Sequence, residues 1–245
     1  MIITNLASGS KGNSTIVETK RLNILIDAGL PLSNLSKRID KTFPKVDVLI
    51  LTHTHTDHIK GLDSFLKKYN PLLITTENEK EEKLKRYNKI NYEKKYNIEG
   101  IEIETFKLSH DVPCIGLLIK EAEKELVYIT DTGYIKEKTL DRIKNKDMYI
   151  IESNYDEEML INGNKYPFYL KQRIRSPKGH LSNEDTLRYL KYLIGPRTKY
   201  IALAHLSEEN NTPEIVKEKF KYLENKKNIK KVKIYLQDKV NKTIL

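Results

Sequence analysis

Residues 46–58 read VDVLILTHTHTDH, a short apolar run followed at once by three histidines and an aspartate. The run has the length and the β-branched content of a buried strand. Side chains two residues apart in an extended chain point to the same side, so His53 and His55 can grip one ion together. Asp57 and His58 then begin a helix and turn toward a neighbouring position. We therefore interpret this motif as metal-binding rather than as a solvated polar loop.

Further candidate ligands lie just beyond other apolar runs. His110 follows IEIETFKLS, Asp131 follows LVYIT and His205 follows YIALA. Loops at strand ends are where α/β proteins assemble their sites. Two ions about 3.5–4 Å apart can activate a water and stabilise a leaving oxygen, and these ligand types suit zinc, manganese or iron. We assign His53, His55 and His110 to one ion, Asp57, His58 and His205 to the other, and Asp131 to the bridge between them.

The apolar periodicity predicts sheets covered by helices, which is typical of an α/β sandwich. Helical spacing begins at Asp57 and continues to Tyr69, and two further helices begin at Ser182 and at Thr212. Residues 77–96 are dense in Lys, Glu and Asn, which indicates an exposed helix or arm. No linker divides the chain, so we expect a single domain over residues 1–245. Buried strands are predicted at residues 23–27, 46–52, 101–106, 114–119, 126–130, 148–152 and 200–204.

Charge and composition narrow the class of protein. Lys and Arg number 44 against 34 Asp and Glu, a net charge of +10. This favours an anionic partner, above all nucleic acid, although an AT-rich genome would produce the same excess of lysine. The single cysteine, Cys114, excludes an internal disulfide and a cysteine-based zinc ribbon. Because no apolar run could span a membrane and the first residues lack a secretory pattern, we expect a cytoplasmic enzyme.

Several segments together resemble the metallo-β-lactamase superfamily, and more narrowly its YycJ/WalJ group of bacterial exodeoxyribonucleases. The resemblance implies an αββα sandwich of two mixed sheets flanked by helices, with a two-metal site at one edge. It also implies 5′-to-3′ degradation of DNA ends, linked to mismatch repair. One departure is visible, because the ESN segment usually continues His-Asp and here continues Tyr155-Asp156. The segments that carry the resemblance are LASGSKGNSTIV, THTHTDH, SHDVP, TDTG, IIESN, YPFYLKQRIRSPKGHLSNEDT and AHLSEENNTPE.

The resemblance also implies supporting roles around the metals. Asp27 would orient a metal-bound histidine, whereas its alternative is a simple turn aspartate before Ala-Gly. Larger nucleases of the superfamily insert a second, β-CASP-type domain that clamps nucleic acid. Only 48 residues separate Asp131 from His180. We expect strands and loop there, and therefore expect the catalytic domain itself to hold DNA.

Two segments are candidates for contacts with DNA. Residues 8–14 form a Gly/Ser turn whose amides could make an anion nest for a phosphate, including a 5′-terminal one; a plain hairpin turn is the alternative. Basic and aromatic side chains alternate before His180, where they could contact phosphates and stack on unpaired bases; an exposed loop with its aromatics packed on the sheet is the alternative. The candidates are Ser10, Lys11, Asn13 and Ser14 in the first segment, and Tyr166, Phe168, Tyr169, Lys171, Arg173, Arg175 and Lys178 in the second.

The tripeptide His-Leu-Ser occurs twice, at His180 and at His205, in different settings. His205 follows a buried strand, whereas His180 follows a basic loop just ahead of the N-cap Ser182. A helix N-terminus favours an anion, and the resemblance to related phosphodiesterases implies that His180, with Ser182 as a further candidate, faces the substrate phosphate. By resemblance His180 would protonate the leaving 3′ oxygen, and Asp57 would accept a proton from the attacking water. The alternative for His180 is a histidine that fills a loop.

Two other functions compete with a nuclease. The same fold could hydrolyse a small ester, thioester, lactone or cyclic phosphate, because fold does not determine substrate. The chain could also be a non-catalytic DNA-binding protein of repair. Such a protein would be expected to lose metal ligands, and all seven candidates are present here.

Overall fold

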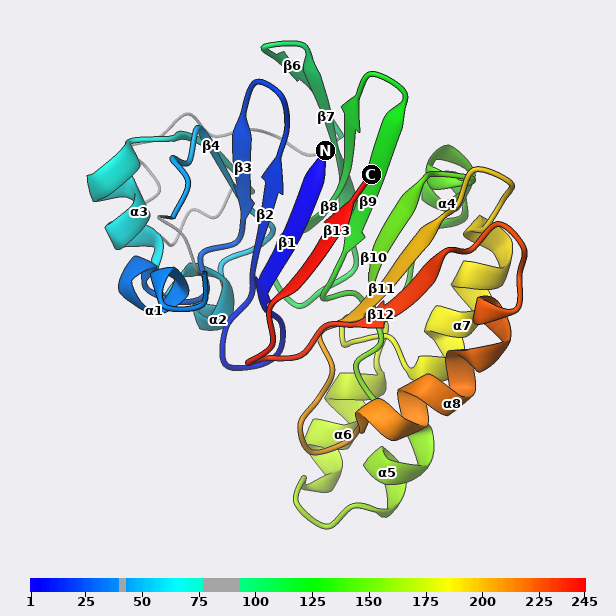
Figure 1. The fold of residues 1–245 in the computed structure, drawn as a ribbon. Coiled ribbons are helices and arrows are strands. Elements are labelled where there is room, and N and C mark those ends of the chain that lie inside the picture. The colour runs from blue at the N-terminus through cyan, green and yellow to red at the C-terminus, as the bar shows by residue number, and fades with distance from the viewer. Residues whose placement is uncertain (40–42, 77–92) are drawn as a thin grey trace.

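Two β-sheets lie face to face in the computed structural model, which describes residues 1–39, 43–76 and 93–245 (Figure 1). In spatial order the six-stranded sheet consists of β13 (Asn241–Ile244), β1 (Ile2–Ala7), β2 (Ser14–Glu18), β3 (Asn23–Ile26), β4 (Val48–Leu51) and β5 (Leu72–Thr75). Its strands β3, β4 and β5 are parallel, and the others pair antiparallel. The sheet is therefore mixed.

The second sheet has seven strands. In spatial order they are β12 (Lys231–Ile234), β11 (Tyr200–Ala204), β10 (Met148–Glu152), β9 (Lys124–Ile129), β8 (Cys114–Glu121), β7 (Ile101–Leu108) and β6 (Lys95–Ile98). Strands β9 to β12 are parallel, and β6 to β9 are antiparallel. All seven predicted strands are present in the two sheets.

Helices cover both outer faces, which confirms the predicted αββα sandwich (Figure 1). The six-stranded sheet carries α1 (Leu32–Ser36), α2 (Thr56–Ile59) and α3 (Leu62–Tyr69). The seven-stranded sheet carries α4 (Glu137–Ile143), α7 (Asn183–Leu193) and α8 (Pro213–Glu224). Two short helices, α5 (Glu157–Asn162) and α6 (Phe168–Arg175), lie beside α8 at the bottom of the view.

The central strands are apolar on both faces because each face is covered. Along β10, Met148 and Ile150 belong to the core between the sheets, whereas Tyr149 and Ile151 pack with the helices. Alternate side chains of a strand point to opposite faces. A strand buried on both faces therefore reads as a continuous apolar run, and this is why the sequence revealed it.

The two predicted helix N-termini at Ser182 and Thr212 are confirmed, but the helix predicted from Asp57 consists of two helices. The backbone N–H of Asp185 donates to Ser182 Oγ at 3.0 Å, and that of Ile215 donates to Thr212 Oγ1 at 3.2 Å. The helix expected from Asp57 to Tyr69 divides into α2 and α3 around Gly61. A Cβ at Gly61 would lie 2.0 Å from the Leu30 carbonyl oxygen. The two helices thus meet where the backbone of Gly61 packs directly against that of Leu30.

The expectation of strands and loop between Asp131 and His180 is wrong. The segment contains α4, β10, α5 and α6. Helix α6 buries none of its residues, so it lacks the apolar stripe by which sequence reveals a helix. Most of the Lys-rich stretch at 77–96 lies outside the described residues, and its last two residues begin β6.

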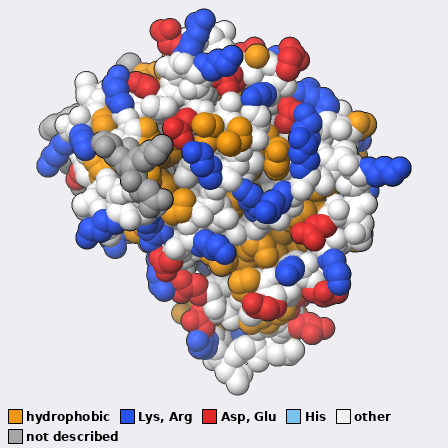
Figure 2. Space-filling view, in the orientation of Figure 1, with side chains coloured by type: hydrophobic (Ala, Val, Ile, Leu, Met, Phe, Trp, Pro, Cys, Tyr) orange, Lys and Arg blue, Asp and Glu red, His pale blue; other side chains and the backbone are white. Residues whose placement is uncertain are grey.

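The surface is rich in cations. Figure 2 shows lysine and arginine side chains spread over one face, with hydrophobic side chains gathered where β12 and α8 lie. Within the described ranges, no helix is both long enough and apolar enough to cross a membrane.

We predict that Gly61→Ala lowers the free energy of unfolding by about 1–3 kcal/mol, because its methyl group would overlap the Leu30 carbonyl. Denaturant titration followed by circular dichroism measures the effect. Lys67→Ala, an exposed position in α3, is the control and should change stability by less than about 0.5 kcal/mol. Equal stability of Gly61→Ala and the wild type would contradict the close approach.

Candidate metal centre and substrate cleft

Strand ends supply the candidate site, and the chain turns sharply at several of them. Asp27 and His205 directly follow β3 and β11, and Asp131 lies two residues beyond β9. All three have left-handed backbone, with φ of 59°, 57° and 61°. This conformation costs a residue with a Cβ roughly 1–2 kcal/mol. Such strain is typical of functional sites, where the surrounding packing maintains it.

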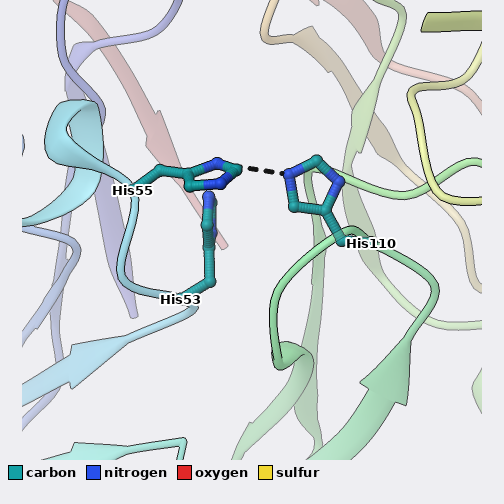
Figure 3. Close-up of side chains that lie close together, drawn as sticks. All are labelled: His53, His55 and His110. Atoms are coloured by element: carbon teal, nitrogen blue, oxygen red, sulfur yellow. Dashed lines mark hydrogen bonds between the residues drawn. The ribbon is translucent and has the colours of Figure 1, made fainter. Parts of the chain in front are cut away.

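The first predicted set of ligands is brought together. His53 and His55 lie in the loop after β4. The ring of His55 points toward His110, which follows β7, and the ring of His53 points toward that of His55 (Figure 3). His55 Nδ1 lies 3.4 Å from His110 Nε2. One ligand nitrogen from each of the three lies within 4.8 Å of the others, close enough to hold one ion.

The second predicted set lies beside the first. Asp57 Oδ2 is 3.4 Å from His58 Nε2 and 3.8 Å from His205 Nε2. Asp131 Oδ2 is 3.4 Å from His58 Nε2, and Asp131 also groups with His53 of the first set. Asp131 thus lies between the two sets, the position that a bridging ligand needs.

Unsatisfied buried atoms test whether ions fit. His53 Nε2, His205 Nε2 and Asp131 Oδ2 are buried and have no hydrogen-bond partner among the described residues. Each such atom costs about 1–3 kcal/mol if nothing satisfies it. A divalent ion in each set would satisfy these atoms, since imidazole and carboxylate are its usual ligands. The residues present therefore fit two metal ions.

A buried carboxylate orients His58. Asp27 is wholly buried, and its Oδ2 lies 2.8 Å from His58 Nδ1. The Thr52 amide and hydroxyl donate to the same carboxylate at 2.8–3.1 Å. Because Nδ1 is engaged, Nε2 of His58 points to Asp57 and Asp131. Carboxylates commonly hold metal-binding histidines in this way.

Glu152 orients two further histidines, His180 and His205. The sequence analysis did not predict this role for Glu152. Its wholly buried Oε1 lies 2.7 Å from His180 Nδ1 and 2.8 Å from His205 Nδ1. Backbone amides of Thr132 and Leu181 donate to its other oxygen. The signal was an acid that ends the buried run MYIIE, just as Asp27 ends NILID.

The two His-Leu-Ser copies flank the segment that follows Glu152. The amide of Asn154 donates to the Leu181 carbonyl at 2.9 Å, and the amide of Ser207 donates to the Asn154 carbonyl at 2.8 Å. The side chain of His205 is 5% exposed and that of His180 is 21% exposed. Asp131, Glu152, His180 and His205 also lie close enough to hold an ion. In this set, however, the Nδ1 atoms of His180 and His205 already bond Glu152, which separates it from the sets around His53 and Asp57.

Asp111 is a second residue that the sequence reasoning missed. Its Oδ1 lies 3.2 Å from His55 Nε2 and 3.3 Å from His110 Nε2, and its Oδ2 pairs with Arg173 of α6. It therefore fixes the ring of His55 and links α6 to the first ligand set. Its position directly after His110 was the only signal.

A cleft of about 280 Å³ opens over both ligand sets. Of the predicted substrate contacts, Ser10, Tyr166, Arg173 and Lys178 line it, together with His180. The other candidates lie elsewhere. Three of the cations bond other groups of the protein: Lys11 pairs with Glu208, Arg175 pairs with Glu157, and Lys171 donates to carbonyls at the end of α5. Two aromatic residues, Phe168 and Tyr169, are 75% and 74% exposed outside the cleft. The remaining three candidates are buried: Asn13, Ser14 and Ser182.

The expected anion nest at residues 8–14 is not free to bind a phosphate. Amides of Gly9, Lys11, Gly12 and Asn13 already donate to acceptors of the protein. The Asn13 side chain instead lies 3.1 Å from Asp57 Oδ2 and 3.0 Å from His58 Nε2. Through Asn13 the loop supports the second candidate ligand set, and of the residues 8–14 only Ser10 lines the cleft.

Buried charges set the protonation of the centre. Burial lowers the pKa of His58, but Asp27 and Asp131 outweigh it and raise this pKa to about 10. Burial also lowers the pKa values of His205 and His180, but nearby carboxylates outweigh burial, so both pKa values are raised. Burial lowers the pKa of His53 well below its usual value. Without metal, protons on His58, His180 and His205 therefore balance the carboxylates, whereas His53 is neutral.

Known proteins share this architecture. The family described as beta-lactamase superfamily domain matches residues 22–202. The chain belongs to the metallo-β-lactamase superfamily. Exodeoxyribonuclease WalJ of Streptococcus pneumoniae (serotype 2, strain D39 / NCTC 7466) is 39% identical over 225 residues, 86% of this chain and 83% of that protein. Exodeoxyribonuclease YycJ of Bacillus anthracis is 35% identical over 224 residues, 86% and 84% of the two chains.

Solved structures agree with the fold of this superfamily. The metallo-β-lactamase fold protein YhfI from Bacillus subtilis superposes with a TM-score of 0.72 over 99% of this chain and 100% of that one, at 17% identity. The superfamily resemblance read from the sequence motifs is confirmed.

We predict that this superfamily member releases protons when it takes up Zn²⁺ or Mn²⁺, because the ions replace protons on His58 and His205. Affinity should rise about tenfold per pH unit, between about pH 6 and 8, for each proton displaced. Calorimetry in two buffers of different ionisation enthalpy measures the release. Asp27→Asn, which removes a charge that holds the His58 proton, should release fewer protons. Identical heats in both buffers and a pH-independent affinity would contradict this.

Proposed function

We propose that this protein is a metal-dependent phosphodiesterase that degrades DNA from its ends, as a 5′-to-3′ exodeoxyribonuclease. The observation that carries the proposal is the cleft in which five of the seven candidate metal ligands meet basic side chains of α6 and its following loop, with His53 and His58 buried in the same ligand sets. The two relatives named exodeoxyribonuclease support DNA as the substrate. We also propose a role in mismatch repair in the cytoplasm, and a preference for 5′-phosphorylated ends.

Superfamily membership implies divalent metal ions, and we propose two of them. The donor set of five imidazoles and two carboxylates suits Mn²⁺ or Zn²⁺, and also iron. When bound, the ions would lower the pKa of a water and stabilise the charge that develops on the phosphoryl group.

The protein's own groups then hold and move the protons. His58 and His205 lower the pKa of Asp57 against the effect of burial, so its carboxylate is ionised. Its place in the cleft, beside His205, makes it the proposed acceptor of a proton from the attacking water. The Nδ1–H of His180 donates to Glu152, which leaves Nε2 for the cleft. As the bond between phosphorus and the 3′ oxygen breaks, the Nε2 proton passes to that oxygen. The released nucleotide keeps a 3′ hydroxyl, and the shortened strand keeps a 5′ phosphate.

Arg173 and Lys178 are the proposed contacts to the DNA backbone. The Arg173 side chain is 63% exposed and lines the cleft, as does Lys178. Phosphate contacts position a strand without reading its sequence. We therefore expect degradation with little sequence preference. The same basic rim counts against a small neutral ester as substrate, and the complete ligand set counts against a non-catalytic protein.

DNA ends test the proposal directly. We expect degradation of linear DNA labelled at one end, with 5′-phosphate ends cut faster than 5′-hydroxyl ends, and no cutting of closed circular DNA. The assay is run with Mn²⁺ and with Zn²⁺, beside a small ester substrate as control. Equal cutting of circular and linear DNA would refute the exonuclease. Absence of DNA hydrolysis at full metal content, with turnover of the ester, would favour the alternative hydrolase.

Replacement of the two His-Leu-Ser histidines should have different effects, one on metal content and the other on kcat. His205→Ala should lower metal content, chiefly at the second ion, because its Nε2 belongs to that ligand set. His180→Ala should retain both ions and lose about 10²- to 10⁴-fold in kcat, the range for a proton donor. Elemental analysis and steady-state kinetics measure the two effects. Loss of an ion in His180→Ala would instead make His180 a ligand.

A further inference from the structure

Strand β12 and helix α8 enclose a hollow that the proposed nuclease does not use. It measures about 440 Å³ and lies on the face seen in Figure 2, where hydrophobic side chains gather among lysines. Val216 and Phe220 of α8 line it from one side, and Val232, Ile234 and Leu236 line it from the other.

The backbone edge of β12 is unpaired along this hollow. Strand β12 ends the order of the seven-stranded sheet and pairs only with β11 among the described strands. The amide of Lys231 donates to Lys199, and that of Tyr235 donates to Leu203. Because successive residues of a parallel strand point to alternate sides, the N–H and C=O groups of Val232 and Ile234 face the free edge.

The two faces of β12 differ in chemistry. Val232 and Ile234 pack with the core beneath α8. Lys231 and Lys233 alternate with them, and the Lys233 ammonium reaches across to Thr243 Oγ1 in β13 at 2.9 Å. A strand added beside β12 would therefore find an apolar face on one side and a basic face on the other.

The positive charge at this edge is not balanced. Lys217, Lys231, Lys233 and Lys239 line the hollow, and no carboxylate of the described residues forms an ion pair with them. Glu224 is the one acid in the lining. The Lys233 ammonium donates to the Lys242 carbonyl and the Thr243 hydroxyl, neither of which is charged.

We propose that the free edge of β12 binds an extended peptide segment of a partner protein in which acidic and apolar residues alternate. The segment adds as a strand, with main-chain hydrogen bonds to Val232 and Ile234. Its acids meet Lys231 and Lys233, and its apolar residues fill the hollow beside α8.

Other occupants fit less well. Unpaired bases of a nucleic acid would find no ring to stack on, because the aromatic residue of the lining, Phe220, is 1% exposed. A second copy of this chain paired through β12 would bring lysines of both copies together. The hollow adjoins another that shares Pro213, Leu236 and Lys239, and that one shares Leu206 and Ser207 with the metal cleft. A partner bound at β12 would thus be held near the cleft.

A synthetic probe tests this site. The probe is a fluorescein-labelled, acetylated octapeptide of sequence Asp-Ile-Glu-Val-Asp-Ile-Glu-Val, titrated with the full-length protein and followed by anisotropy. We expect saturable binding in the micromolar range that weakens as salt increases. A peptide of the same composition with its acids grouped first, and a peptide with lysine in place of each acid, should bind at least tenfold more weakly.

Variants locate the probe. The double variant Lys231→Glu/Lys233→Glu should lose at least tenfold in affinity. Val232→Pro should do the same, because it removes an edge N–H that does not pair with β11. Lys67→Glu, an exposed lysine of α3 on the other sheet, is the matched control and should bind like the wild type. Melting temperature and size-exclusion chromatography check that each variant is folded.

Several results would overturn the proposal. These are no saturable binding to the wild type, equal binding of the grouped peptide, or equal losses in the β12 double variant and in Lys67→Glu. Competition by single-stranded DNA that depends on Lys231 and Lys233 would make this edge a nucleic-acid surface. Failure to bind, with self-association of the double variant, would mean that the lysines only protect the edge from pairing.

Discussion

Two buried carboxylates hold the histidines of this protein, and the candidate site depends on them. Asp27 ends a strand of one sheet and bonds His58, whereas Glu152 ends a strand of the other and bonds both His180 and His205. A carboxylate without water is costly unless it is paired and hydrogen-bonded. Each acid here accepts bonds from backbone amides as well as from imidazole. The same bonds that satisfy the acids also determine which ring nitrogen faces the candidate ligand sets.

The apolar sandwich makes this arrangement possible, because it positions the loops at one edge without letting them move apart. Two Asp-x-Gly turns show how tightly the loops pack. A Cβ at Gly29 would lie 1.9 Å from the Asp57 carbonyl oxygen, and one at Gly133 would lie 2.4 Å from that of Ser176. The first turn begins at Asp27 and the second begins at Asp131. Backbone contact of this kind holds each of these two loops against the segment packed beside it.

Helix α6 and the loop after it form the proposed substrate-binding side of the cleft. Arg173 and Lys178 bring cations to a cleft whose floor is made of histidines and carboxylates. Asp111 joins the two, since it pairs with Arg173 and lies beside His55. A phosphate that drew Arg173 away would leave Asp111 beside His55 and His110. The ion pair between Arg173 and Asp111 thus connects the proposed substrate contact with the first ligand set.

The sequence by itself determined the buried strands, the helix caps and the metal motif, because each depends on residues close together in the chain. The period of apolar residues reports burial on both sheet faces, and THTHTDH carries its ligand spacing within seven residues. Only the tertiary structure decided which polar residues meet in the cleft. Glu152 lies 28 residues from His180 and 53 from His205, and no local pattern encodes such a contact. For the same reason Asn13 and Ser182, which read as substrate contacts, are buried supports, and the exposed helix α6 was read as a loop.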